Sequence, residues 1–122
     1  MSQPTISPDM TINDLLQWAV LQRERLRKDA NAERASEPAL VLAQAAKLTE
    51  EVGELQAEIL GHAGYQRKSK NKVFDADSMG AELADVTICV AILAVAHNID
   101  LGKALARKMV KVESRYSEPE SR

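Results

Sequence analysis

The sequence predicts an all-α protein. Ala, Leu and Val are abundant, while aromatic residues make up only 3% of the 122 residues, a balance that favours helices over a β-sandwich or barrel. Apolar residues make up 45% and recur at three- and four-residue spacing along four segments, which is the helical period. We expect a single domain over residues 1–122, with a core from about 11 to 116 and flexible ends.

The first predicted helix begins near Thr11, where Thr11 and Asp14 have the spacing of a capping box. The polar stretch Arg27–Ser36 ends its apolar pattern. A second helix is predicted from just after Ser36 to about Leu60, because Pro38 is tolerated in a first turn and Gly61 and Gly64 are stop signals. The apolar stripe of this second helix consists of Val41, Ala45, Leu48, Val52, Leu55 and Ile59.

A basic loop is predicted over Gly64–Phe74, followed by a third helix capped by Asp77 or Ser78. Its second half, Val86–Ala96, is apolar nearly all round, which is typical of a helix buried on several sides. A short chain offers few partners for such a helix, so we expect a second subunit to complete the core. This run is well short of the roughly 20 residues that a membrane-spanning helix needs, and no membrane association is expected.

A fourth helix is predicted after the turn His97–Ile99, with Asp100 as its cap. It carries an apolar stripe of Leu101, Leu105, Met109 and Val112 beside a basic stripe of Lys108, Lys111 and Arg115. The tail Ser117–Arg122 is expected to fray.

The formal net charge is −2, so nothing in the composition calls for a nucleic-acid partner. Cys89 is the one cysteine and stands in an apolar run, where it is expected to pack as a small hydrophobic residue. The N-terminal residues have no signal-peptide pattern. The single cysteine and the lack of a signal-peptide pattern together favour a cytoplasmic location.

Two pairs of carboxylates stand out: Glu51 with Glu54, and Glu82 with Asp85, each three residues apart and so on one helical face. Either pair alone is most simply a solvated surface. If the two helices pack together, the pairs meet, and each like-charge pair at about 5 Å costs roughly 3 kcal/mol at an effective dielectric of about 20. An all-oxygen site of this kind suits Mg²⁺ or Mn²⁺ rather than Zn²⁺.

A ferritin-like di-iron bundle is a rival interpretation, because it also gathers glutamates between helices. That site needs Glu-x-x-His pairs. Neither His62 nor His97 follows a glutamate by three residues, which argues against it.

The segments Lys47–Leu55 (KLTEEVGEL) and Ala81–Val86 (AELADV) together resemble the MazG-like family of all-α nucleoside triphosphate pyrophosphohydrolases. The resemblance implies a four-helix, bundle-like MazG fold completed by homo-oligomerisation, as a homodimer or homotetramer. It also implies Mg²⁺, with Mn²⁺ as a substitute, and cleavage of (d)NTP between the α- and β-phosphates to NMP and pyrophosphate.

Carried over residue by residue, the resemblance assigns the metal to Glu51, Glu54, Glu82 and Asp85, and Glu50 matches a glutamate that often precedes the first ligand in that family. As a mechanistic hypothesis, Glu50 or Glu51 orients the attacking water or takes its proton. Candidate substrate contacts are Lys47, Trp18, Lys108, Lys111 and Arg115, although each also fits an ordinary surface or core role. Two alternatives stay open: a related pyrophosphatase of the phosphoribosyl-ATP type, and a non-catalytic helical binding or regulatory module.

Overall fold

The computed structural model describes residues 4–29, 37–65 and 73–117. Within these ranges the chain forms helices and no strand: α1 (Ile12–Asp29), α2 (Glu37–His62), α3 (Ala76–Ala96) and α4 (Leu101–Ser117). The predicted all-α class is confirmed. The four basic side chains of the predicted loop (Arg67, Lys68, Lys70 and Lys72) and the predicted frayed tail after Ser117 lie outside the described residues.

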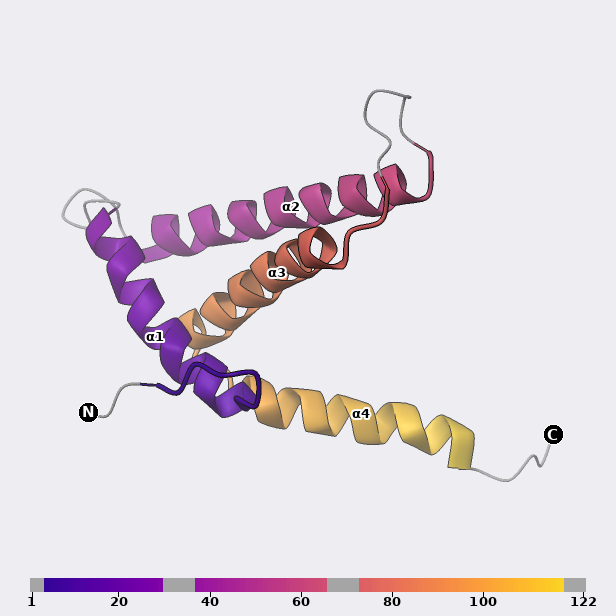
Figure 1. Cartoon of the computed structure of the whole chain (residues 1–122). Helices are drawn as coiled ribbons and strands as arrows, with labels where there is room; N and C mark the ends of the chain where they lie inside the picture. Colours follow the sequence, from indigo (N-terminus) through magenta and orange to yellow (C-terminus); the bar gives the residue numbers. More distant parts are fainter. Residues whose placement is uncertain (1–3, 30–36, 66–72, 118–122) are drawn as a thin grey trace.

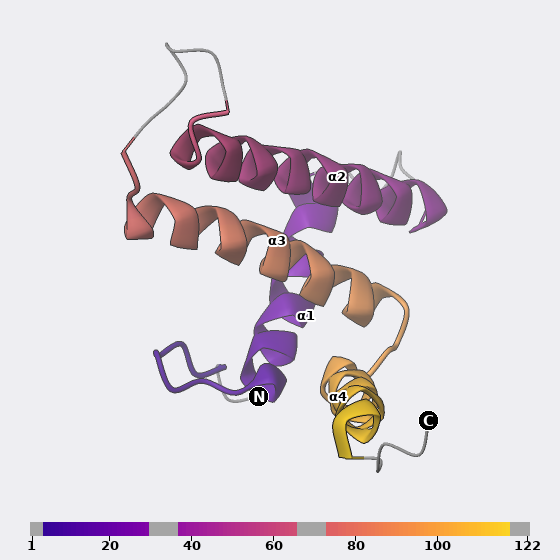
Figure 2. The ribbon, with the colours of Figure 1, turned by 90° about the vertical axis from the view of Figure 1, so that its right-hand side faces the viewer.

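Helix α3 lies between two neighbours and organises the molecule. It runs alongside α2, and α1 crosses behind it in the view of Figure 2 (Figures 1 and 2). Helix α4 contacts α1 and extends away from the α2–α3 pair (Figure 1). The four helices therefore do not close into a complete bundle within one chain.

The small core lies where α1 crosses α3. Ala19 and Ala91 are fully buried there and Ile92 almost so, with Leu15, Leu16, Ile88 and Val95 packed around them. Alanine at the crossing lets the two helix backbones approach closely, because no longer side chain separates them. None of the larger described side chains is fully buried, so the hydrophobic stabilisation available within one chain is modest.

Two predicted helix starts are confirmed in detail. The Thr11 amide donates to Asp14 Oδ2 at 2.9 Å and the Asp14 amide donates to Thr11 Oγ1 at 3.1 Å, which is a reciprocal capping box. At the start of α4, Asp100 Oδ1 accepts from the Lys103 amide at 3.1 Å.

The predicted cap of α3 is wrong. Asp75, rather than Asp77 or Ser78, is the N-cap, because its backbone is extended and its side chain accepts from the Asp77 amide at 3.0 Å. The preceding Phe74 packs edge-on against His62 at a centroid distance of 5.1 Å. The end of α2 thus contacts the chain as it enters α3, which begins two to three residues earlier than expected.

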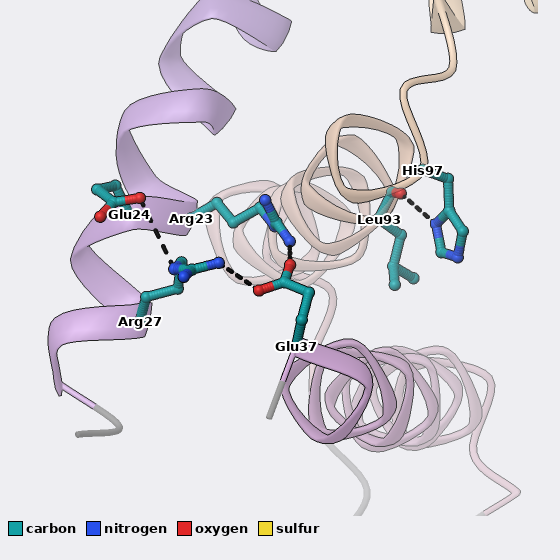
Figure 3. Close-up of polar contacts among 6 residues, drawn as sticks. All are labelled: Arg23, Glu24, Arg27, Glu37, Leu93 and His97. Atoms are coloured by element: carbon teal, nitrogen blue, oxygen red, sulfur yellow. Dashed lines mark hydrogen bonds and ion pairs between the residues drawn. The ribbon is translucent and has the colours of Figure 1, made fainter. Parts of the chain in front are cut away.

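A three-residue ion cluster joins the C-terminal half of α1 to the start of α2. Arg23 and Arg27 both pair with the Glu37 carboxylate (Figure 3).

At the end of α3, His97 Nδ1 lies 2.7 Å from the Leu93 carbonyl oxygen and closes that helix (Figure 3). These contacts are partly exposed, so each contributes modestly to the free energy of unfolding.

Much apolar surface remains uncovered in the single chain. Leu83 and Val90 on α3 are 50% and 36% exposed, and Met109 on α4 is 65% exposed. Helix α3 has a mean hydropathy of 1.9 over its most apolar window and, by length and composition alone, could cross a membrane. Core helices of water-soluble proteins meet the same criterion, and the first half of α3 carries three carboxylates, those of Asp77, Glu82 and Asp85.

Candidate metal centre

The first half of α3 packs against the middle of α2, and acidic side chains from both helices meet there. Glu51 of α2 and Glu82 and Asp85 of α3 each offer one carboxylate oxygen, and these oxygens all lie within 4.8 Å of one another. Of the first expected pair, Glu51 therefore meets both members of the second pair, whereas Glu54 does not belong to this group. We call this set the interhelix acidic group.

A second group lies along α2 itself. Glu50, Glu51 and Glu54 also offer oxygens within 4.8 Å of one another. Glu51 belongs to both groups, so a single carboxylate links the exposed acids of α2 to those of α3. Glu54, the remaining residue of the sequence prediction, reaches the centre through this second group.

Burial distinguishes Glu51 from its neighbours. It is only 6% exposed, whereas Glu50, Glu54 and Asp85 are exposed. The Oε2 atoms of Glu51 and Glu82 are buried and have no hydrogen-bond partner among the described residues. A buried, ionised carboxylate oxygen without a partner is costly, and a proton or a cation removes that cost.

The electrostatics of the cluster point in the same direction. The negative charge of Glu51 raises the pKa of Glu54, with smaller contributions from burial and from Glu82 and Glu50. Lys47 opposes this effect in part, since its Nζ lies 3.1 Å from Glu51 Oε1 and 3.6 Å from Glu50 Oε1. One ammonium cannot balance five neighbouring acids, so the donor set fits a hard divalent cation with oxygen ligands.

The other predicted substrate residues are dispersed. Trp18 is half-buried and lines an apolar pocket of about 200 Å³ between the N-terminal segment, α1 and α3, with Met10, Leu15 and Ile88 among its walls. The basic stripe Lys108, Lys111 and Arg115 is exposed on α4, which extends away from α2 and α3 (Figure 1). Within one chain, only Lys47 among these five residues contacts the acidic cluster.

A second buried acid, Glu58, was not among the residues predicted from the sequence to form the site. Glu58, 6% exposed, accepts a short hydrogen bond from Ser78 Oγ of α3 and lies 3.2 Å from His62 Nε2. It stands seven residues after Glu51, so both face α3 at a spacing of two helical turns. That spacing is the signal from which its burial could have been predicted.

This fold and this cluster define a class: an all-α protein whose acidic side chains could hold a divalent metal ion at a helix–helix seam. A sequence model of the MazG nucleotide pyrophosphohydrolase domain matches residues 41–118, and the chain belongs to that family. The matched residues run from the first turns of α2 through α4 and include all five acids of the two groups. Comparisons with curated proteins and with solved structures found no match.

Proposed function

We propose that this protein is a Mg²⁺-dependent nucleoside triphosphate pyrophosphohydrolase, which cleaves (d)NTP between the α- and β-phosphates to NMP and pyrophosphate. The observation that carries the proposal is the convergence of Glu51, Glu82 and Asp85. Glu51 and Glu82 each have a buried oxygen that meets no hydrogen-bond partner in the described ranges. Membership of the MazG family supports the reaction class, because that family acts on nucleotides.

The residues that would hold the metal are Glu51, Glu82 and Asp85, with Glu54 adding a fourth carboxylate from α2. When bound, Mg²⁺, or Mn²⁺ in its place, neutralises triphosphate charge and makes water a better nucleophile. Glu51 is held firmly by its burial, which suits a ligand whose position must not change during turnover.

Glu50 is the proposed general base, with Glu51 orienting the water. Glu50 is exposed at the edge of the cluster, where an ionised carboxylate can reach a water molecule without first losing its own hydration. Water attacks the α-phosphorus in line, its proton passes to Glu50, and the bond to the bridging oxygen breaks. Pyrophosphate leaves with the electron pair of that bond.

Substrate contacts complete the proposal. Lys47 already lies beside the acidic cluster and can meet a phosphate, whereas Lys108, Lys111 and Arg115 would have to approach from another copy of the chain. Trp18 would receive the base in its apolar pocket, where stacking does not require polar partners.

We further propose a cytoplasmic homodimer or homotetramer without nucleic-acid or membrane partners. The support is the uncovered apolar surface of α3 and α4, including Leu83, Val90 and Met109. A second copy would bury these side chains, as the apolar second half of α3 requires.

The decisive experiment incubates the purified protein and Mg²⁺ with a panel of nucleoside triphosphates and with phosphoribosyl-ATP, and measures pyrophosphate release. Glu51→Gln and Glu82→Gln should each lower kcat by about 10³-fold or more, since each removes a ligand charge at the reaction centre. Glu113→Gln, which changes an exposed glutamate of α4, is the matched control and should retain full activity.

Other outcomes separate the alternatives. Preferential cleavage of phosphoribosyl-ATP would reassign the substrate while keeping the metal site. No release from any substrate, together with no Mn²⁺ binding by calorimetry, would leave a helical binding module.

A further inference from the structure

Lys47 contacts two of the acids proposed to serve the reaction. It stands one turn before Glu51 on α2, and its Nζ lies 3.1 Å from Glu51 Oε1 and 3.6 Å from Glu50 Oε1. Unlike Glu51, whose side chain is 8% exposed, the Lys47 side chain is 51% exposed. A lysine on a flexible stem at the surface can leave such a contact without disturbing the packing of α2 against α3.

The two oxygens of Glu51 have different surroundings. Oε1 accepts Lys47, whereas Oε2 is buried and unpartnered within the described part of the chain. The same carboxylate belongs to both acidic groups. An ammonium at this distance repels a divalent cation twice as strongly as it would repel a monovalent one at the same separation. Binding of a divalent cation at Glu51 is therefore weaker while the Lys47 ammonium remains in contact with the same carboxylate.

We propose that Lys47 is a built-in counter-ion that competes with the divalent cation for Glu51 and turns to the phosphates of the nucleotide once the cation is bound. The proposal rests on the proposed function, because it needs a metal at Glu51. It adds a coupling: the triphosphate gives Lys47 a new anionic partner, so nucleotide and cation strengthen each other's binding.

The influence of Lys47 extends across the cluster. Its pKa is raised, first by the hydrogen bond to Glu51 and then by the charge of Glu50. On α3, burial is the main cause that raises the pKa of the Cys89 thiol; Glu51 raises it further, and Lys47 lowers it. Lys47 thus partly neutralises charge that α3 also experiences, which is the role of a counter-ion.

The test is calorimetric titration of the metal-free protein with Mn²⁺, with and without an α,β-methylene nucleoside triphosphate that cannot be cleaved at the reactive bond. Lys47→Met should bind Mn²⁺ alone about tenfold more tightly than the wild type, because its competitor is gone. The nucleotide should tighten Mn²⁺ binding less in Lys47→Met than in the wild type. Lys47→Arg should stay close to the wild type.

Lys103→Met is the matched control, since it removes the same charge from an exposed site on α4. Thermal unfolding with a chelator present gives a second measurement: Lys47→Met should unfold at a lower temperature than Lys103→Met, and Mn²⁺ should restore it. Equal or weaker Mn²⁺ binding by Lys47→Met would overturn the counter-ion role. A wild-type protein that binds no Mn²⁺ would instead overturn the proposed function itself.

Discussion

At the scale of the residue, the spacing of acids along two helices predicted which side chains could meet if the helices packed together. Glu51, Glu82 and Asp85 are brought together as the sequence pattern predicted, although their role as metal ligands stays a prediction. The spacing could not predict which of these acids would be buried and which exposed. Burial of Glu51 but not of Glu54 depends on how far α3 covers α2, which only the packed pair of helices determines.

The raised pKa of Glu54 predicts an unusual pH dependence of the metal-free protein. The folded state, chiefly through Glu51, holds the Glu54 proton more tightly than the unfolded chain does. Because of this one group, the folded state becomes less stable as the pH rises from the ordinary pKa of glutamate to the raised pKa of Glu54. Glu54→Gln should remove this component, which thermal unfolding in chelator at a series of pH values would measure.

The same variant should respond differently to metal. At neutral pH without metal, Glu54→Gln should unfold at a higher temperature than the wild type, because one repulsion is gone. Saturating Mn²⁺ should stabilise the wild type more than the variant. If Glu54→Gln lowered the unfolding temperature in chelator, the repulsive account of this cluster would be wrong.

At the scale of the element, helix starts follow from local chemistry where the apolar pattern begins directly after the cap. Thr11 with Asp14 and Asp100 were correctly chosen, because Ile12 and Leu101 follow them at once. The start of α3 has two aspartates and a serine within four residues, and each can cap. Phe74, the residue before the observed cap, contacts His62, and this contact joins segments that the sequence does not show to be neighbours.

Removal of the true cap of α3 should be measurable. Asp75→Ala should lower the free energy of unfolding by about 1 kcal/mol, since the Asp77 amide loses its acceptor. Urea unfolding of the metal-free protein would give the difference. Asp77→Ala is the comparison, because it leaves the Asp75 cap in place. A larger loss in Asp77→Ala than in Asp75→Ala would show that the cap has been misassigned.

At the scale of the whole molecule, the amphipathic pattern predicted four helices but could not predict where α4 lies. A stripe such as Leu101, Leu105 and Met109 indicates that a helix needs an apolar partner, but it does not identify which surface that partner is. Within the chain, α4 touches α1 near its start and has no buried residue along its described length.

The proposed assembly predicts a specific sensitivity. The double variant Leu105→Gln/Met109→Gln should have a smaller mass in solution than the wild type, because it removes apolar area that a second copy would bury. Light scattering at micromolar concentration would measure this change. Arg107→Gln, on the opposite face of α4, should keep the wild-type mass. A wild-type protein that is already monomeric under these conditions would contradict the assembly.

The weak packing of α4 within one chain also affects how long a newly synthesised chain survives. A 17-residue helix with no buried side chain is only marginally stable by itself in water. We therefore expect a freshly synthesised copy to be readily digested by cellular proteases until it meets another copy. Doubling the rate of synthesis would then more than double the steady-state amount of the protein in a cell.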